Sequence, residues 1–232
     1  GGEGLINGAN IWINGSGSFT TATVAHELGH TYGLLHSNLW RVTDANPISP
    51  GGSTLEYGDP FDTMGSTSVT NVTRDARHHF NAWHKNRLGW LLDAAVTTVT
   101  ASGTYRIYRF DSRNAPRTQP QALRIFNDGV RWYWVGLRQN FATGTPQANS
   151  AYIVWGYNNR QQSQLLDLTT PGVTATDAAL PIGSTFTDAA HGISIKPIAR
   201  GGDEPSQFLD VEVTMPVAPV SSTTVSVGAT LR

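Results

Sequence analysis

The sequence of 232 residues contains no cysteine, and this absence restricts both its stabilisation and its metal chemistry. Without thiols the chain has no disulfide bonds, on which small eukaryotic extracellular domains usually depend. It also has no thiolates, the ligands that often close structural zinc sites with four protein groups. We therefore expect any zinc site here to use histidine or carboxylate side chains, and a bacterial secreted protein fits this composition better than a eukaryotic one.

Charged side chains are scarce, since only 14% of the residues are Asp, Glu, Lys or Arg, with 16 basic residues against 17 acidic ones. With so few and so evenly balanced charges, the electrostatic field of the protein gives no reason to expect nucleic acid or an anionic membrane as the main partner. No apolar run approaches the length of about 18 residues that a spanning helix needs, and no signal-like segment is present. We therefore expect a soluble protein with no membrane span and no nucleic-acid partner.

The most informative segment that is present is residues 26–37, which read HELGHTYGLLHS. On an α-helix, residues four positions apart lie on one face, so His26 and His30 can direct ring nitrogens at the same metal ion. Gly33 can adopt the left-handed conformation that ends a helix, and the returning chain can present His36 as a third ligand. Three protein ligands leave one position open, as in a catalytic zinc site.

Glu27 follows the first histidine and is offset from it around the helix, so it is suited to hold a water molecule rather than the metal. We predict that it acts as a general base. The alternative is a helix with solvated histidines. Chance produces HExxH in roughly one chain in a few hundred of this length, and the added Gly and His lower that frequency roughly a thousandfold. The catalytic interpretation is therefore favoured.

The pattern HExxHxxGxxH resembles that of the metzincin clan of zinc endopeptidases, in which a downstream methionine lies beneath the zinc-bound histidines. Met64, within the turn-like FDTMGS of residues 61–66, is the matching residue. The surroundings resemble gametolysin-like peptidases at residues 56–59 (EYGD) and 80–85 (FNAWHK), and more loosely at residues 165–167, 177–183 and 186–188. The resemblance implies a zinc endopeptidase that hydrolyses peptide bonds of extracellular proteins.

The resemblance, together with the short β-type runs separated by turns after residue 93, predicts an α+β fold. We expect a metzincin-like catalytic region over residues 1–92, with an active-site helix, a methionine turn and a second helix, followed by an antiparallel β-sandwich-like domain over residues 93–216. Residues 217–232 resemble a linker or the start of a further module. Only 25 residues precede His26, so an upper subdomain is expected to be truncated, either removed by processing or supplied by another chain.

Local patterns predict individual elements. Residues 9–14 are predicted to form a strand, either a substrate-binding sheet edge or an ordinary internal strand, and residues 21–32 and 73–88 are predicted to form helices. Further strands are predicted at residues 105–110, 122–126, 132–137, 151–157, 193–198 and 208–213. Aromatic side chains between residues 132 and 157 fit either a sandwich core, which we favour, or a carbohydrate-stacking platform.

Several alternatives stay open. Glu56, Asp59 and Asp62 can be calcium ligands or solvated turn residues, and the latter is favoured because no known calcium-loop pattern is matched. No tyrosine closely follows Met64, so the oxyanion would be stabilised by zinc, by Tyr57 or by another loop donor. The chain could also be a zinc-stabilised binding or scaffold protein whose β domain recognises glycan or protein. Hydrolysis of a non-peptide amide would use the same metal-site chemistry.

Overall fold

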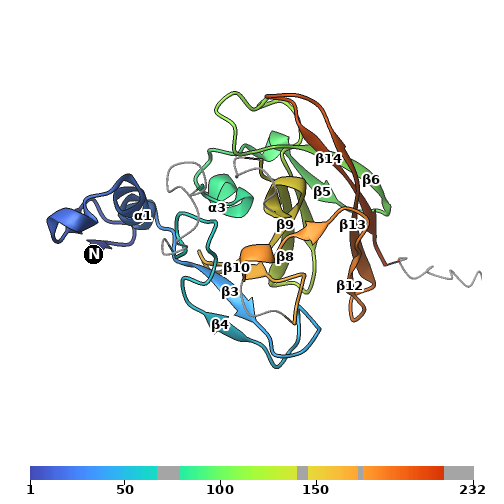
Figure 1. Ribbon diagram of the computed structural model, residues 1–232, viewed down its shortest axis with the longest axis horizontal. Helices are drawn as coiled ribbons and strands as arrows, with labels where there is room; N and C mark the ends of the chain where they lie inside the picture. Colours follow the sequence, from blue (N-terminus) through green and yellow to red (C-terminus); the bar gives the residue numbers. More distant parts are fainter. Residues whose placement is uncertain (67–78, 140–145, 172–174, 217–232) are drawn as a thin grey trace, which may run out of the picture.

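The computed structural model describes residues 1–66, 79–139, 146–171 and 175–216, and most of the regular structure in this part is β-strand. A small antiparallel sheet of β1 (Gly2–Gly4) and β2 (Ile11–Ile13) packs against helix α1 (Thr21–Thr31). Figure 1 shows this unit at one end of the molecule, with the remaining sheets toward the other end. No helix of the described residues is both long and apolar enough to span a membrane.

The central element is an eight-stranded mixed sheet of order β4-β3-β10-β9-β8-β7-β5, with β11 paired to β9. Its strands are β3 (Ser37–Arg41), β4 (Ser53–Leu55), β5 (Val96–Val99), β7 (Ala122–Phe126), β8 (Arg131–Leu137), β9 (Ser150–Tyr157), β10 (Ser163–Leu166) and β11 (Leu180–Pro181). The pairs β3–β10 and β5–β7 are parallel, whereas the other pairs are antiparallel.

A second sheet is antiparallel and has the order β12-β13-β14-β6. Its strands are β6 (Gly103–Tyr108), β12 (Phe186–Asp188), β13 (Ile193–Gly201) and β14 (Phe208–Thr214). Short 3-10 helices occur at η1 (Ser16–Ser18), η2 (Asp93–Ala95), η3 (Pro146–Asn149) and η4 (Ala175–Asp177). The main apolar core lies between this sheet and one face of the central sheet, and it contains Ile107, Ile153 and Val211.

The opposite face of the central sheet is covered by helix α3 (Ala82–Arg87) and by Phe61, which together form a second apolar cluster. Because both faces are covered, β8 and β9 are nearly continuously buried instead of alternating between apolar and polar residues. Tyr133, Trp134 and Trp155 are at most 4% exposed, so these aromatic side chains belong to the core and form no open platform.

The predicted fold class, an α+β metzincin-like catalytic region followed by an antiparallel β-sandwich-like domain, is wrong. The described structure is mainly β-sheet, and its two α-helices are short. The reason is a long-range pairing: β3 begins directly after His36 and pairs in parallel with β10, so that Ser37 lies opposite Ser163. The division between residues 92 and 93 stays a prediction, although strands from both sides of it share the central sheet.

Predictions of individual elements from local patterns agree better with the structure. The first helix lies at Thr21–Thr31, where the Thr20 side chain accepts a hydrogen bond from the Thr23 backbone N–H, and Gly33 has the predicted left-handed φ of 89°. Strand β2 and the six predicted later strands are present, with boundaries shifted by a few residues. The second helix is shorter than predicted, at Ala82–Arg87, while residues 73–78 and 217–232 lie outside the described residues.

Candidate metal centre

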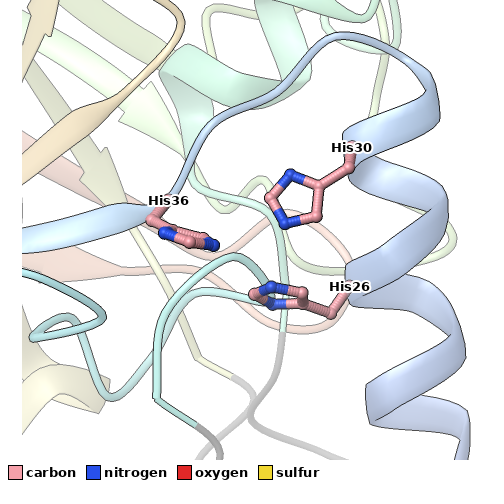
Figure 2. Close-up of side chains that lie close together, drawn as sticks. All are labelled: His26, His30 and His36. Atoms are coloured by element: carbon pink, nitrogen blue, oxygen red, sulfur yellow. The ribbon is translucent and has the colours of Figure 1, made fainter. Parts of the chain in front are cut away.

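The three predicted histidine ligands come together in the structure. His26 and His30 project from the same side of α1, and His36 projects toward them from the residue before β3 (Figure 2). One ring nitrogen from each lies within 4.8 Å of the other two, and this is the sole group of three or more such side chains among the described residues. The fold therefore assembles the trio that the motif predicted.

Each histidine uses its Nδ1 atom in a hydrogen bond to an acceptor. His26 Nδ1 is 2.8 Å from the Thr63 carbonyl oxygen, and His30 Nδ1 is 2.8 Å from the Leu34 carbonyl oxygen. His36 Nδ1 is 2.7 Å from the Glu56 carboxylate. Since carbonyl and carboxylate oxygens only accept hydrogen bonds, Nδ1 carries a proton in all three rings, and Nε2 is the nitrogen left to coordinate a metal. This is the arrangement that orients metal-binding imidazoles, so the three residues fit a zinc ion.

The surroundings of His26 and His36 favour the neutral ring, which is the form that binds metal. Burial lowers the pKa of His26 to about 4, although the hydrogen bond to Thr63 opposes the shift. Burial also lowers the pKa of His36, against the opposing effect of Glu56. At neutral pH both rings therefore carry a free lone pair without first losing a proton.

Glu27 lies beside the histidines. It lines the same cavity of about 490 Å³ as the three histidines and is itself 6% exposed. Burial raises the pKa of its carboxyl group, whereas His30 opposes that shift. Strand β1 passes so close that a Cβ atom on Gly2 would lie 2.6 Å from Glu27 Oε1. Residues of β1 line the cavity and those of β2 do not, so the strand predicted at residues 9–14 is not the one that borders the site.

Met64 is fully buried against the helix that carries two of the histidines. A Cβ atom on Gly29 would lie 2.3 Å from Met64 Sδ, so this glycine, which sequence analysis did not single out, leaves the space that the methionine occupies. The Met64 carbonyl accepts a hydrogen bond of 2.8 Å from the Ser37 N–H, next to the third histidine. Its role as a floor beneath a bound metal stays a prediction.

A buried carboxylate fixes the turn that carries Met64. Asp62 Oδ1 accepts a hydrogen bond of 2.6 Å from the Met64 N–H, and Asp62 Oδ2 accepts one of 2.5 Å from the Asn81 N–H. Burial alone would raise the pKa of Asp62, but His84 and these backbone donors together hold it below its usual value. Because Thr63 lies between Asp62 and Met64, the same contacts fix the carbonyl that orients His26.

The other two acidic residues of the loop also have specific partners. Asp59 is fully buried and accepts hydrogen bonds from Ser37 Oγ and from the Tyr152 hydroxyl. Burial and the nearby charge of Asp62 raise its pKa to about 6. Glu56 is bound to His36, and the three carboxylates form no cluster of metal ligands in the described structure. No sequence pattern indicated the contact of Glu56 with His36, a histidine 20 residues away in the chain.

No known protein family matches the chain, and comparisons with curated proteins and with solved structures found no match either. Function is therefore inferred from the chemistry and geometry of the site.

Proposed function

We propose that this chain is a zinc-dependent endopeptidase with a motif that resembles the metzincin pattern, acting on extracellular proteins. The observation that carries the proposal is the trio of His26, His30 and His36, with every Nδ1 atom bound to an acceptor and Glu27 in the same cavity. A site that only stabilised the fold would have no need of a carboxylate beside three converging imidazoles. This feature favours an enzyme over a scaffold protein.

Zinc bound by the three histidines would act as a Lewis acid and lower the pKa of a water molecule to about 7. Glu27 would then accept the proton of the attacking water at a carboxylate oxygen and deliver it to the leaving amine. Its partly desolvated environment supports this role, because a raised carboxyl pKa brings proton affinity closer to neutral pH. The closeness of Gly2 keeps the carboxylate against the wall of the cavity.

The test uses an unstructured substrate, casein, with the purified chain. We expect cleavage that stops with a chelator and returns with zinc. Glu27→Gln should bind zinc like the wild type but lose about 10²–10⁴-fold in turnover, since the amide cannot accept the proton. Glu212→Gln, which changes an exposed carboxylate on β14, is the matched control. Wild-type turnover by a zinc-loaded Glu27→Gln protein would contradict the role of Glu27, and a zinc-loaded wild type that leaves casein intact would contradict the endopeptidase proposal.

A further inference from the structure

The partner of His36 differs from those of the other two histidines. His26 and His30 are oriented by backbone carbonyl groups, which the fold fixes once α1 and the methionine turn are in place. His36 is oriented instead by the carboxylate of Glu56, a side chain that is 65% exposed. A carboxylate partner is a stronger acceptor than a carbonyl group and makes an imidazole a better electron donor to a metal.

The next residue contacts the same ring from a different direction. The Tyr57 ring lies with its centroid 3.8 Å from that of His36, with a tilt of 36°, and with its centroid 5.9 Å from that of His26. Glu56 therefore holds His36 at its Nδ1 edge, and Tyr57 covers one face of the ring. Both residues also line the cavity that contains Glu27.

The backbone of Tyr57, the residue that follows Glu56, is in a strained conformation. Tyr57 has a φ of 59°, in the left-handed region that residues with side chains rarely adopt. Its N–H donates a hydrogen bond of 3.0 Å to Oδ1 of Asn38, a residue that is 3% exposed. Since Asn38 lies two positions after His36, the segment that carries the ligand also holds the strained turn. Strain of this kind persists where surrounding structure enforces it, and it is common at functional sites.

We propose that Glu56 and Tyr57 form a clamp that positions His36 as the third metal ligand, and that this clamp sets the affinity of the centre for zinc. The inference rests on the proposed zinc site. Glu56 keeps the proton on Nδ1 and thereby leaves Nε2 free, while Tyr57 prevents the ring from rotating out of the cavity. His26 and His30 need no such device, because they are held by α1 and by backbone groups. In this proposal Glu56 and Tyr57 are positioning residues that act through His36.

The test measures zinc affinity by competition with a chelating dye, together with urea unfolding of the zinc-free protein. Glu56→Ala should weaken zinc binding about 10–100-fold, the usual effect of removing such a partner. Glu56→Gln should recover part of the loss, because its amide oxygen still accepts from Nδ1–H. Because Glu56 is exposed, both variants should unfold at the same urea concentration as the wild type. Glu212→Ala, an exposed glutamate on β14, controls for the lost charge.

Tyr57 is tested through the backbone strain. Tyr57→Gly should weaken zinc binding while the zinc-free protein keeps or gains stability, since glycine adopts this φ freely. Tyr57→Phe should bind zinc nearly as tightly as the wild type, because it retains the ring.

A spectroscopic measurement tests Glu56 separately. In cobalt-substituted protein, Glu56→Ala should alter the visible absorption bands that report ligand geometry.

The outcomes separate the two proposals. A wild type that fails to bind zinc would overturn the proposed function. If the wild type binds zinc and His30→Ala does not, but Glu56→Ala and Tyr57→Gly bind like the wild type, then the clamp is refuted and the metal centre stands. A loss of zinc-free stability that parallels the loss of affinity in Glu56→Ala would also refute the clamp, because it would indicate a general structural role.

Discussion

Replacing Asp62 by alanine should destabilise the zinc-free protein strongly, because this side chain is the shared acceptor for two segments. Its oxygens accept hydrogen bonds from the Met64 N–H at 2.6 Å and the Asn81 N–H at 2.5 Å, and each lies 3.3 Å from the Nδ1 atom of His84. The side chain is fully buried, so water cannot replace it as an acceptor. The methionine turn and the start of α3 would both lose a partner.

The magnitude follows from counting the groups left without a partner. A buried N–H that loses its acceptor costs about 1–3 kcal/mol, so the two backbone N–H groups cost about 2–6 kcal/mol, and the lost contact with His84 adds to this cost. Asp62→Asn keeps one acceptor oxygen and turns an amide donor toward the other N–H, so its cost should be about half. Small domains are stable by about 5–15 kcal/mol in total, and the alanine variant should therefore lose a large share of its stability.

The assay is urea unfolding of the zinc-free protein at neutral pH. Asp44→Ala is the matched control, because the Asp44 carboxylate also accepts a backbone hydrogen bond, from Asn46 at 3.1 Å, but in an exposed turn. Its effect should stay within about 1 kcal/mol. The expected order of stability is wild type close to Asp44→Ala, then Asp62→Asn, then Asp62→Ala. If Asp62→Ala were as stable as Asp44→Ala, the buried carboxylate would not hold the turn.

Three further predictions concern the site and its surroundings. Gly2→Ala should displace the Glu27 carboxylate and reduce casein cleavage without changing zinc affinity in a dye competition, because the new Cβ would lie 2.6 Å from Oε1; wild-type cleavage would contradict this. The pKa of Asp59 is raised to about 6, above its value of about 3.9 in an unfolded chain, so the folded state binds this proton more tightly and the contribution of Asp59 to stability should fall as the pH rises from about 4 to 6. Asp59→Asn removes that effect, so wild-type stability relative to the variant should decline by up to about 3 kcal/mol over this range in zinc-free urea unfolding, and a constant difference would count against it. Zinc at 100 times its dissociation constant should stabilise the wild type by about 2.7 kcal/mol in the same assay and His30→Ala by much less, whereas equal stabilisation would place the ion elsewhere.

Much of the candidate metal centre could be predicted because its arrangement depends on local geometry. The spacing of His26 and His30 decides that both lie on one face of a helix, and Gly33 permits the turn that returns the chain toward them. The same helical periodicity predicts that Glu27 is offset around the helix from the two histidines. These relations involve residues within about one helical turn of one another, so an isolated sequence contains them.

The sequence by itself identified the three histidines that the structure brings together, excluded cysteine from the candidate site and predicted the positions of most strands. The tertiary structure alone decided how those strands pair and what holds the site in place. Strand β3 pairs with β10, and their partner residues Ser37 and Ser163 are 126 positions apart in the chain. This pairing is the reason that the predicted fold class was wrong. Glu56 reaches His36 in a similar way, through a turn whose conformation no local pattern specifies. The physical reason is that strand pairing and side-chain contacts between distant segments depend on the packing of the whole chain, whereas helix periodicity depends only on near neighbours.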